Sequence, residues 1–274
     1  MIAAGVDVGS TATKAILVDD NHRIVARSLI NTGANVTKAA ERVFAEVVKK
    51  AGIEEHDVLQ VVGTGYGRYK VTFGHAQVTE ISCHARGAAF LFPRTRIILD
   101  IGGQDTKAIR IKPGGDVEDF CMNDKCAAGT GRFLEAAANT MGIPLDDIGP
   151  LSLQYRQVIK VTNVCTVFVE SEILAHLARG RAPADILRGV HLAIAGRSVA
   201  LMRRVGMEPE ITLTGGVSRN IGIVKALEEK LAQKLNVGAD AQFIGAIGAA
   251  IFALDRCHAA GVAGGAHVAV DRRD

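Results

Sequence analysis

The most constraining feature of this 274-residue chain is a short motif that occurs twice. The copies are Asp7-Val-Gly-Ser-Thr-Ala-Thr-Lys14 and Asp100-Ile-Gly-Gly-Gln-Asp-Thr-Lys107, and six of the twelve residues that start at each aspartate are identical. Each copy follows a short apolar run and leads into another, which predicts a strand, a tight glycine turn and a second strand. We call residues 7–14 hairpin 1 and residues 100–107 hairpin 2. A chain with two such hairpins is predicted to contain two related halves.

The residue types in both hairpins favour phosphate binding. Gly9, Gly102 and Gly103 permit close approaches that a side chain blocks, so backbone amides can converge on phosphate oxygens. Asp7 and Asp100 each end a buried strand, where a carboxylate needs a cation or hydrogen-bond donors, and Mg²⁺ on a nucleotide meets that need. For one copy alone, a turn-capping aspartate is an equal alternative. The duplication favours the interpretation that both aspartates face a metal ion.

The composition is that of a globular protein, with 48% hydrophobic and 22% charged residues. The absence of Trp and a net charge of +3 count against a nucleic-acid partner, because base stacking and a polyanion need aromatic and basic surfaces. No charged-then-apolar leader precedes the first strand, and no apolar run has the length of a bilayer span. We therefore expect a cytoplasmic protein with no membrane contact.

Two of the five cysteines occur in sequence contexts that suggest reactivity or metal binding. Cys126 opens a glycine-rich run before a predicted helix at 133–141, and Cys165 directly precedes a predicted helix at 166–177. The amides at a helix N-terminus stabilise negative charge on a nearby sulfur. Two thiolates are too few for a closed four-ligand site, but a two-fold dimer would bring four together. Buried structural cysteines remain the alternative from spacing alone.

The other three cysteines are interpreted as packing residues. Cys121 is close enough to the pair to be a ligand, but it lies in a predicted strand at 117–122, where a small buried residue is the simpler interpretation. Cys83 and His84 are adjacent on a predicted helix and point in different directions, which favours core packing over a metal site. Cys257 has no identifiable partner.

The remaining segments form an alternating pattern of helices and strands. Helices are predicted at 37–51, 80–92, 133–141, 166–177, 184–202, 223–235 and from 242, and further strands at 58–62, 117–122, 158–161 and 211–214. Gly63–Arg68 is a glycine turn with a weak signal for ligand binding, whereas Gly215–Asn220 opens a helix and suits packing against a base or ribose. Gly245, Gly248 and nearby alanines should let the last helix pack closely on another element. The tail after Gly261 is expected to fray.

The order of DVGSTATK, DIGGQDTK, LTGGVSRN and AQFIGAIGAA is similar to the phosphate-1, phosphate-2, adenosine and terminal-helix elements of the acetate and sugar kinase, Hsp70 and actin superfamily. The resemblance implies an α/β, ribonuclease H-like duplicated fold with a nucleotide cleft between two lobes. The lobes are expected at residues 1–94 and 95–274. The resemblance also allows the terminal helix, about residues 242–257, to pack back on the first lobe.

Within that superfamily, MNDKCAAGTGRFLE and VCTVFVESE resemble the BadF/BadG/HgdC family. Its members are ATP-dependent activators (component A, archerases) of 2-hydroxyacyl-CoA dehydratases and ATP-binding subunits of benzoyl-CoA reductases. The resemblance covers nearly the whole chain and implies one 4Fe-4S cluster shared by a homodimer through Cys126 and Cys165 of each subunit. It further implies an iron-sulfur dehydratase or reductase as partner and a low-potential ferredoxin or flavodoxin as electron donor.

The resemblance also assigns the residues that would bind Mg²⁺ with ATP or ADP. Those expected at the phosphates are Ser10, Thr11, Ala12, Thr13, Lys14, Gly102 and Gly103. Gln104 would lie near the γ-phosphate and orient the attacking water, since an amide both donates and accepts hydrogen bonds; with Asp7 and Asp100 it forms the expected catalytic set. Those expected around the adenosine are Gly215, Gly216, Asn220 and Gln242.

The expected activity is ATP hydrolysis coupled to transfer of one low-potential electron to a 2-hydroxyacyl-CoA dehydratase. Three alternatives stay open. The first is an ATP-binding subunit of a benzoyl-CoA reductase. The second is a small-molecule kinase of the same fold without a cluster, and the third is a scaffold that binds ATP without turnover.

Overall fold

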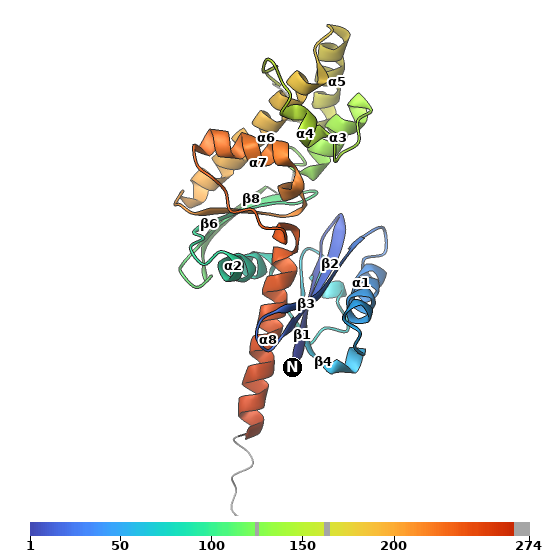
Figure 1. Cartoon of the computed structure of the whole chain (residues 1–274), viewed down its shortest axis with the longest axis vertical. Coiled ribbons are helices and arrows are strands. Elements are labelled where there is room, and N and C mark those ends of the chain that lie inside the picture. The colour runs from blue at the N-terminus through green and yellow to red at the C-terminus, as the bar shows by residue number, and fades with distance from the viewer. Residues whose placement is uncertain (124–125, 162–164, 266–274) are drawn as a thin grey trace, which may run out of the picture. The chain divides into compact units, whose positions relative to one another are not determined.

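A computed structural model describes residues 1–123, 126–161 and 165–265, which form two compact units, each built on one sheet (Figure 1). Unit 1 comprises Met1–Gly87 and the chain from Phe243 onward, and unit 2 comprises Ala88–Gln242. The sheet of unit 1 has the strand order β3-β2-β1-β4-β5, and that of unit 2 has the order β8-β7-β6-β9. In both sheets an antiparallel three-strand meander is extended by a parallel strand next to its first strand, and the duplicated motif forms the first two strands and their turn in each.

Unit 1 holds hairpin 1 in the turn between its first two strands. Its strands are β1 (Ile2–Val8), β2 (Ala12–Asp19), β3 (Ile24–Asn31), β4 (Val58–Thr64) and β5 (Ala76–Gln77), its α-helices are α1 (Val36–Ala51) and α8 (Ile244–Gly265), and short 3₁₀ segments lie at Glu55–Asp57 and Arg68–Lys70. Helix α2 (Glu80–Leu91) crosses the boundary between the units. Helix α1 begins at Asn35, whose side chain accepts a hydrogen bond from the Lys38 amide, and ends at Gly52 in the left-handed conformation.

The two faces of strand β1 are covered by different helices. Ala4, Val6 and Val8 belong to a core cluster with the apolar residues of α1, including Val43 and Phe44. The intervening residues point to the opposite face, because side chains alternate along a strand. That second face packs against α8, where a side chain on Gly5 would overlap the backbone of Ala246. Strand β1 is therefore buried on both sides, which explains its nearly continuous apolar sequence.

Helix α8 packs closely on its neighbours through small residues, which confirms the prediction for Gly245 and Gly248. A Cβ on Gly248 would overlap the carbonyl of Cys83 on α2, and a Cβ on Gly87 would overlap the carbonyl of Ile244. The backbones of α2 and α8 therefore touch where they cross.

Unit 2 holds hairpin 2 and both predicted cluster cysteines. Its strands are β6 (Ile97–Ile101), β7 (Thr106–Ile111), β8 (Val117–Asn123) and β9 (Ile211–Thr214), its α-helices are α3 (Gly131–Met141), α4 (Ile148–Ser152), α5 (Thr166–Ala178), α6 (Pro183–Val205) and α7 (Ile221–Leu231), and 3₁₀ segments lie at Gly216–Arg219 and Ala241–Phe243. Ile97, Leu99 and Ile101 of β6 pack in one core with Val190 and Ile194 of α6.

The prediction of a strand at 158–161 is wrong. Ile159 and Val161 are buried in the core of unit 2, but no strand pairs with them among the described residues. The segment instead lies against α6, where the Ile159 amide donates to the carbonyl of Asp185 and a side chain on Gly189 would overlap the carbonyl of Ile159. A short apolar run indicates burial, and its hydrogen-bond partner comes from the tertiary structure.

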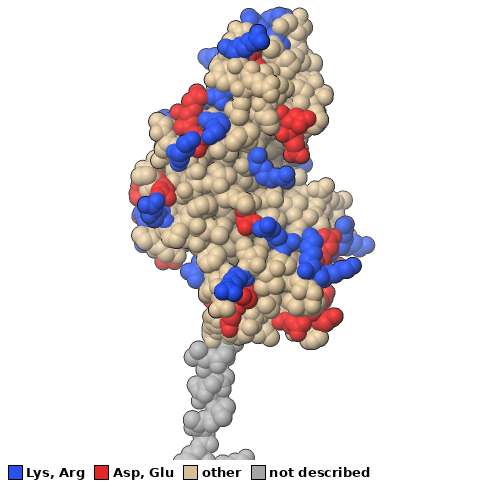
Figure 2. All heavy atoms as spheres, viewed as in Figure 1, with Lys and Arg blue, Asp and Glu red and all other residues tan. Residues whose placement is uncertain are grey.

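The other predicted elements are present with ends shifted by a few residues, and the structure adds β3, β5 and α4. Helix α8 continues to Gly265, beyond the start of the predicted fraying at Gly261, while residues 266–274 lie outside the described part. No helix of the described chain is both long and apolar enough to cross a membrane. On the face shown in Figure 2, basic and acidic side chains are intermixed, in keeping with the small net charge of +3.

Candidate functional site

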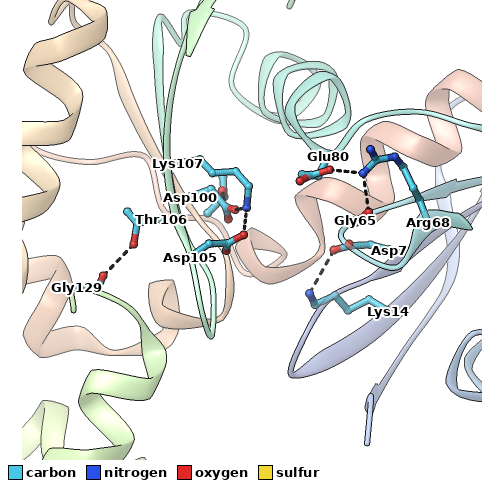
Figure 3. A network of polar contacts seen from close by, with 11 residues as sticks. Asp7, Lys14, Gly65, Arg68, Glu80, Asp100, Asp105, Thr106, Lys107 and Gly129 are labelled. Atoms are coloured by element: carbon cyan, nitrogen blue, oxygen red, sulfur yellow. Dashed lines mark hydrogen bonds and ion pairs between the residues drawn. The ribbon is translucent and has the colours of Figure 1, made fainter. Parts of the chain in front are cut away.

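Each hairpin places an aspartate directly opposite a lysine. Asp7 pairs with Lys14 in the β1–β2 register, and Asp100 pairs with Lys107 in the β6–β7 register. Both carboxylates are buried, with 5% of Asp7 and 4% of Asp100 exposed. A buried carboxylate needs a cation or several donors, so these positions fit the predicted role beside a metal-bound phosphate. Figure 3 shows both aspartates with the ammonium groups directed at them.

The turn of hairpin 1 is exposed to solvent, and Thr32 stabilises it through hydrogen bonds to Gly9 and Thr13. Lys14 Nζ lies 3.2 Å from Oδ2 of Asp7. The Thr32 hydroxyl donates to the carbonyl of Gly9 over 2.8 Å and shares a hydrogen bond of 2.9 Å with the buried hydroxyl of Thr13. The neighbouring turn residues Ser10 and Thr11 are exposed, and Ala12 is half-buried. The exposed turn therefore offers the hydroxyls of residues 10 and 11 to a ligand, while the hydroxyl of residue 13 is already bonded.

Hairpin 2 has the same backbone and a different set of charges. Lys107 Nζ lies 2.6 Å from Oδ2 of Asp105 and 3.6 Å from Oδ2 of Asp100. The Thr214 hydroxyl of β9 donates to Oδ1 of Asp100 over 2.9 Å. Gln104 lies half-buried in the turn, beside Gly102 and Gly103. The sequence prediction included Gln104 and omitted Asp105 and Lys107, although both stand in the duplicated motif.

A glycine loop lies over the aspartate in each unit. The parallel strands end in Thr64-Gly65 and Thr214-Gly215, and each threonine is in register with the aspartate of its unit. Both glycines have positive φ, +87° and +86°. A Cβ on the first would lie 2.5 Å from Oδ1 of Asp7, and a Cβ on the second 2.7 Å from Oδ1 of Asp100. Glycine is needed in both loops because any side chain would collide with the carboxylate.

The two loops are also closed in the same manner. Arg68 Nη1 donates to the carbonyl of Gly65 over 3.1 Å and pairs with Glu80 over 3.0 Å (Figure 3). In unit 2 the Ser218 hydroxyl donates to the carbonyl of Gly215 over 2.7 Å. From the sequence alone, the first of these loops carried only a weak signal for ligand binding. The dipeptide Thr-Gly, shared by both loops, is the signal that links it to the duplication.

His84 is a neighbour of the hairpin 1 carboxylate that the sequence assigned to packing. A Cβ on Gly245 would lie 2.8 Å from His84 Nε2 and 3.2 Å from Oδ2 of Asp7, so the two side chains share the space over this glycine. The adjacent Cys83 is fully buried, and burial raises the pKa of its thiol to about 12, which supports its predicted structural role.

The four residues predicted to surround the adenosine lie near one another in unit 2. The Gly215 amide donates to the carbonyl of Ala241 over 3.2 Å, which places Gln242 beside the Gly215–Gly216 turn. Asn220 follows the same turn and is the N-cap of α7, where its Oδ1 accepts a hydrogen bond of 3.1 Å from the amide of Ile223.

His191 fixes Asn220 from the core side. Its Nε2 lies 3.0 Å from Asn220 Oδ1 and its Nδ1 lies 2.6 Å from the carbonyl of Leu187. Burial, with a smaller contribution from the charge of Arg188, lowers the pKa of His191 to about 4 despite both hydrogen bonds. The imidazole is therefore neutral near pH 7 and carries one N–H, on Nδ1, which donates to the Leu187 carbonyl and holds the ring against Asn220.

The two predicted cluster cysteines differ from the other three in exposure. Cys126 and Cys165 are exposed, Cys121 is half-buried, and Cys83 and Cys257 are buried, with burial raising the pKa of Cys257. Cys165 is the N-cap of α5, as predicted, whereas Cys126 precedes the first residue of α3 by several residues and is not at a helix end. Exposed thiols in a glycine-rich loop and at a helix N-terminus fit metal ligation. Within the described residues no three potential metal ligands converge.

Hairpin 2 is bonded directly to the segment that follows Cys126. The first amides of α3, Gly131 and Arg132, donate to the carbonyls of Gly102 and Gly103, both over 2.9 Å. The Thr106 hydroxyl of β7 donates to the carbonyl of Gly129 over 2.9 Å (Figure 3). At the end of β8, the Asn123 amide group donates to the carbonyls of Cys126 and Ala128. A displacement of the hairpin turn would therefore be transmitted to the cysteine loop through hydrogen bonds.

Known proteins of this architecture confirm the predicted fold class. The chain is similar to a solved structure entitled activator of the 2-hydroxyisocaproyl-CoA dehydratase from Clostridium difficile with bound ADPNP, with a TM-score of 0.91, 36% identity and full coverage of both chains. It also shares its fold with a ROK family glucokinase from Streptomyces griseus, with a TM-score of 0.58, 15% identity and coverage of 93% of this chain and 100% of that one.

Sequence comparison gives the same grouping. The (R)-2-hydroxyglutaryl-CoA dehydratase activating ATPase of Acidaminococcus fermentans is 41% identical over 91% of this chain and 95% of its own. A benzoyl-CoA reductase subunit of Thauera aromatica is 35% identical over 92% of each. The family model described as BadF/BadG/BcrA/BcrD ATPase family matches residues 4–253. With the duplicated hairpins and the exposed cysteine pair, this match shows that the chain belongs to the BadF/BadG/BcrA/BcrD ATPase family.

Proposed function

We propose that this protein is an ATP-hydrolysing iron-sulfur activator that transfers one low-potential electron to a 2-hydroxyacyl-CoA dehydratase. The observation that carries the proposal is the bonding of hairpin 2 to the start of α3, because it joins a phosphate-binding turn to the loop of Cys126. Family membership and relatives named as dehydratase activators give the substrate class of the partner.

In this proposal ATP with Mg²⁺ binds through the two hairpins. The carboxylates of Asp7 and Asp100 face the metal ion and its waters. The phosphates contact Ser10, Thr11, Ala12, Thr13, Lys14, Gly102 and Gly103. Gln104, half-buried in its turn, orients the attacking water. The ADPNP bound in the related activator supports nucleotide binding.

The adenosine lies on the glycine turn of unit 2, among Gly215, Gly216, Asn220 and Gln242. The hydrogen bonds of Ser218 and Asn220 fix the conformation of this turn, whose glycines let the backbone approach a base closely.

Cys126 and Cys165 hold a 4Fe-4S cluster together with the same two residues of a second copy of the chain. The exposed thiols support this, and two cysteines per chain make a homodimer necessary for a four-thiolate site. When bound, the cluster supplies one-electron reduction. A low-potential ferredoxin or flavodoxin is the donor and the dehydratase is the acceptor, and the proposed location of all three is the cytoplasm.

The proposal is tested with protein purified and reconstituted under anaerobic conditions. We expect about four iron and four sulfide ions per two chains, nucleotide hydrolysis, and reduction of a dehydratase that depends on ATP. Cys126→Ser and Cys165→Ser should each lose iron while retaining affinity for ADP. Cys121→Ser, which changes the half-buried neighbour, is the matched control and should keep its iron. A colourless monomer, or a protein that hydrolyses ATP without passing an electron to any partner, would contradict the proposal.

A second candidate is the ATP-binding subunit of a benzoyl-CoA reductase, which the similarity to the Thauera aromatica protein favours. The two functions differ in assembly. A reductase subunit should co-purify in a stable complex of several subunits, whereas an activator should separate from its dehydratase as a dimer. Native mass determination of the complex decides between them.

A further inference from the structure

The two hairpins have the same strand register and the same turn hydrogen bond, but they carry different net charges. Hairpin 1 contains one aspartate and one lysine and is neutral, whereas hairpin 2 contains Asp100, Asp105 and Lys107 and has a net charge of −1. The extra carboxylate of Asp105 stands where hairpin 1 has Ala12, since both occupy the sixth position of the motif. The duplication thus provides an internal comparison for the effect of one side chain.

The side chain of Asp105 occupies the space over the turn glycine of hairpin 2. A Cβ on Gly102 would lie 2.6 Å from Oδ1 of Asp105, whereas the corresponding Cβ on Gly9 would have Lys14 Nζ as its nearest side-chain atom, at 3.6 Å. The same position over the turn is therefore faced by a carboxylate in hairpin 2 and by an ammonium group in hairpin 1.

Asp105 also forms a short ion pair with the hairpin 2 lysine. Its Oδ2 lies 2.6 Å from Lys107 Nζ, and only 5% of the Lys107 side chain is exposed, against 29% for the Asp105 side chain. In hairpin 1, Lys14 is more accessible than Asp7, with 13% and 8% of the side chains exposed. The more exposed side chain of the ion pair is thus the lysine in hairpin 1 and the carboxylate of Asp105 in hairpin 2.

We propose that Asp105 is a positioning residue that retains Lys107 and keeps hairpin 2 negative, so that nucleotide phosphate meets the side chains of this hairpin through a divalent cation, while the turn at Gly102 and Gly103 contacts phosphate through its backbone. Hairpin 1, with its accessible lysine, binds phosphate directly. This inference rests on the proposed nucleotide-binding function and adds to it a division of roles between the two copies. An anionic phosphate is repelled by an uncompensated carboxylate, and a divalent cation between them reverses the sign of the interaction.

The test measures ADP affinity by calorimetry, once with excess Mg²⁺ and once with EDTA. The readout is the ratio of the two dissociation constants, which reports the coupling between metal and nucleotide without any turnover. In the wild-type protein the affinity should be much weaker in EDTA. Asp105→Ala should narrow the ratio about five- to tenfold, mainly by improving metal-free binding, because one negative charge near the phosphates is removed.

Three further variants make the result specific. Asp105→Asn removes the charge but leaves a polar partner for Lys107, and it should narrow the ratio in the same direction even if the alanine variant folds poorly. Ala12→Asp makes the reverse change in hairpin 1 and should widen the ratio. Asp116→Ala removes one exposed carboxylate at the opposite end of β7 and should leave the ratio at the wild-type value.

The outcomes separate this inference from the proposed function. If wild-type protein binds Mg-ADP and both Asp105 variants keep the wild-type ratio within twofold, the role of Asp105 is disproved and the nucleotide function stands. If both Asp105 variants weaken binding equally with and without Mg²⁺, Asp105 has a structural role and the inference also fails. If wild-type protein binds no ADP under either condition, the proposed function and the inference about Asp105 both fail.

Discussion

The Thr214 hydroxyl donates a hydrogen bond of 2.9 Å to Oδ1 of Asp100, so strand β9 holds the carboxylate that opens hairpin 2. The equivalent residue of unit 1, Thr64, is in the same register with Asp7. Its buried hydroxyl has no partner at normal hydrogen-bond geometry among the described residues and interacts weakly with the Cys83 thiol. The two threonines therefore have the same position in the duplicated fold and different energetic roles.

This difference predicts opposite outcomes for the same substitution. Thr214→Val should lower the free energy of unfolding by about 1–3 kcal/mol, because a buried carboxylate loses a donor. Thr64→Val removes a poorly satisfied hydroxyl and should change it by less than about 0.5 kcal/mol. Urea unfolding of both variants measures the difference, and equal losses would contradict the assigned roles.

Lys14→Met should weaken ADP binding about 10- to 100-fold, because hairpin 1 loses its charge-assisted contact to phosphate. Lys38→Met removes the same charge from an exposed position on α1 and is the matched control. Calorimetric titration gives the affinities, and circular dichroism checks that loss of the partner of Asp7 has not unfolded the protein. Unchanged affinity in a folded Lys14 variant would exclude hairpin 1 from phosphate binding.

Gly248→Ala should destabilise unit 1 by about 3 kcal/mol or more, because the new Cβ would overlap the Cys83 carbonyl and force α8 away from α2. Gly196→Ala in α6 is the control, since its Cβ would meet only the flexible end of Lys230, at 3.6 Å. Alanine favours a helix over glycine, so that control should gain about 0.5–1 kcal/mol. Thermal unfolding should therefore shift in opposite directions for the two variants.

Stability should fall in acid because of His191. The folded pKa is about 4 and the ordinary value is 6.5, so between these values the unfolded chain binds more protons than the folded one. The free energy of unfolding therefore decreases as the pH falls from 6.5 to 4, by about 3 kcal/mol for this group. Urea unfolding at several pH values should show a shallower loss for His191→Gln. Parallel curves for the two proteins would contradict the assignment.

Thr106→Val should uncouple the cysteine loop from hairpin 2, because the hydrogen bond to the Gly129 carbonyl is lost. In cluster-free protein, ADP with Mg²⁺ should change the alkylation rate of Cys126, and the variant should reduce that change at least about threefold. The matched control is Thr140→Val, which removes a threonine hydroxyl that donates to the carbonyl of Ala136 within α3 and touches neither hairpin. Equal nucleotide effects in all three proteins would show that this link transmits nothing.

The residues around the two aspartates include some that the sequence predicted and others that it could not predict. Asp7 and Asp100 were found because they stand in a contiguous motif, and contiguous motifs keep their geometry when a strand, a turn and a strand fold locally. Gly65, His84 and Gly245 reach Asp7 from three separate segments, and no local pattern records that encounter. Asp105 also belongs to the contiguous motif. Its ion pair with Lys107 depends on side-chain positions that only the tertiary structure shows.

By itself, the sequence determined the duplicated hairpins, most helices and strands, and the family, since each depends on local periodicity or a compact motif; the assignment of Cys126 and Cys165 as cluster ligands stays a prediction. The tertiary structure decided which glycine loops cover the aspartates, how α8 packs on β1, that 158–161 is buried without forming a strand, and how hairpin 2 bonds to α3. These features arise from contacts between residues distant in the chain. Such contacts are fixed by packing and hydrogen bonding in three dimensions, so no short window of sequence contains them.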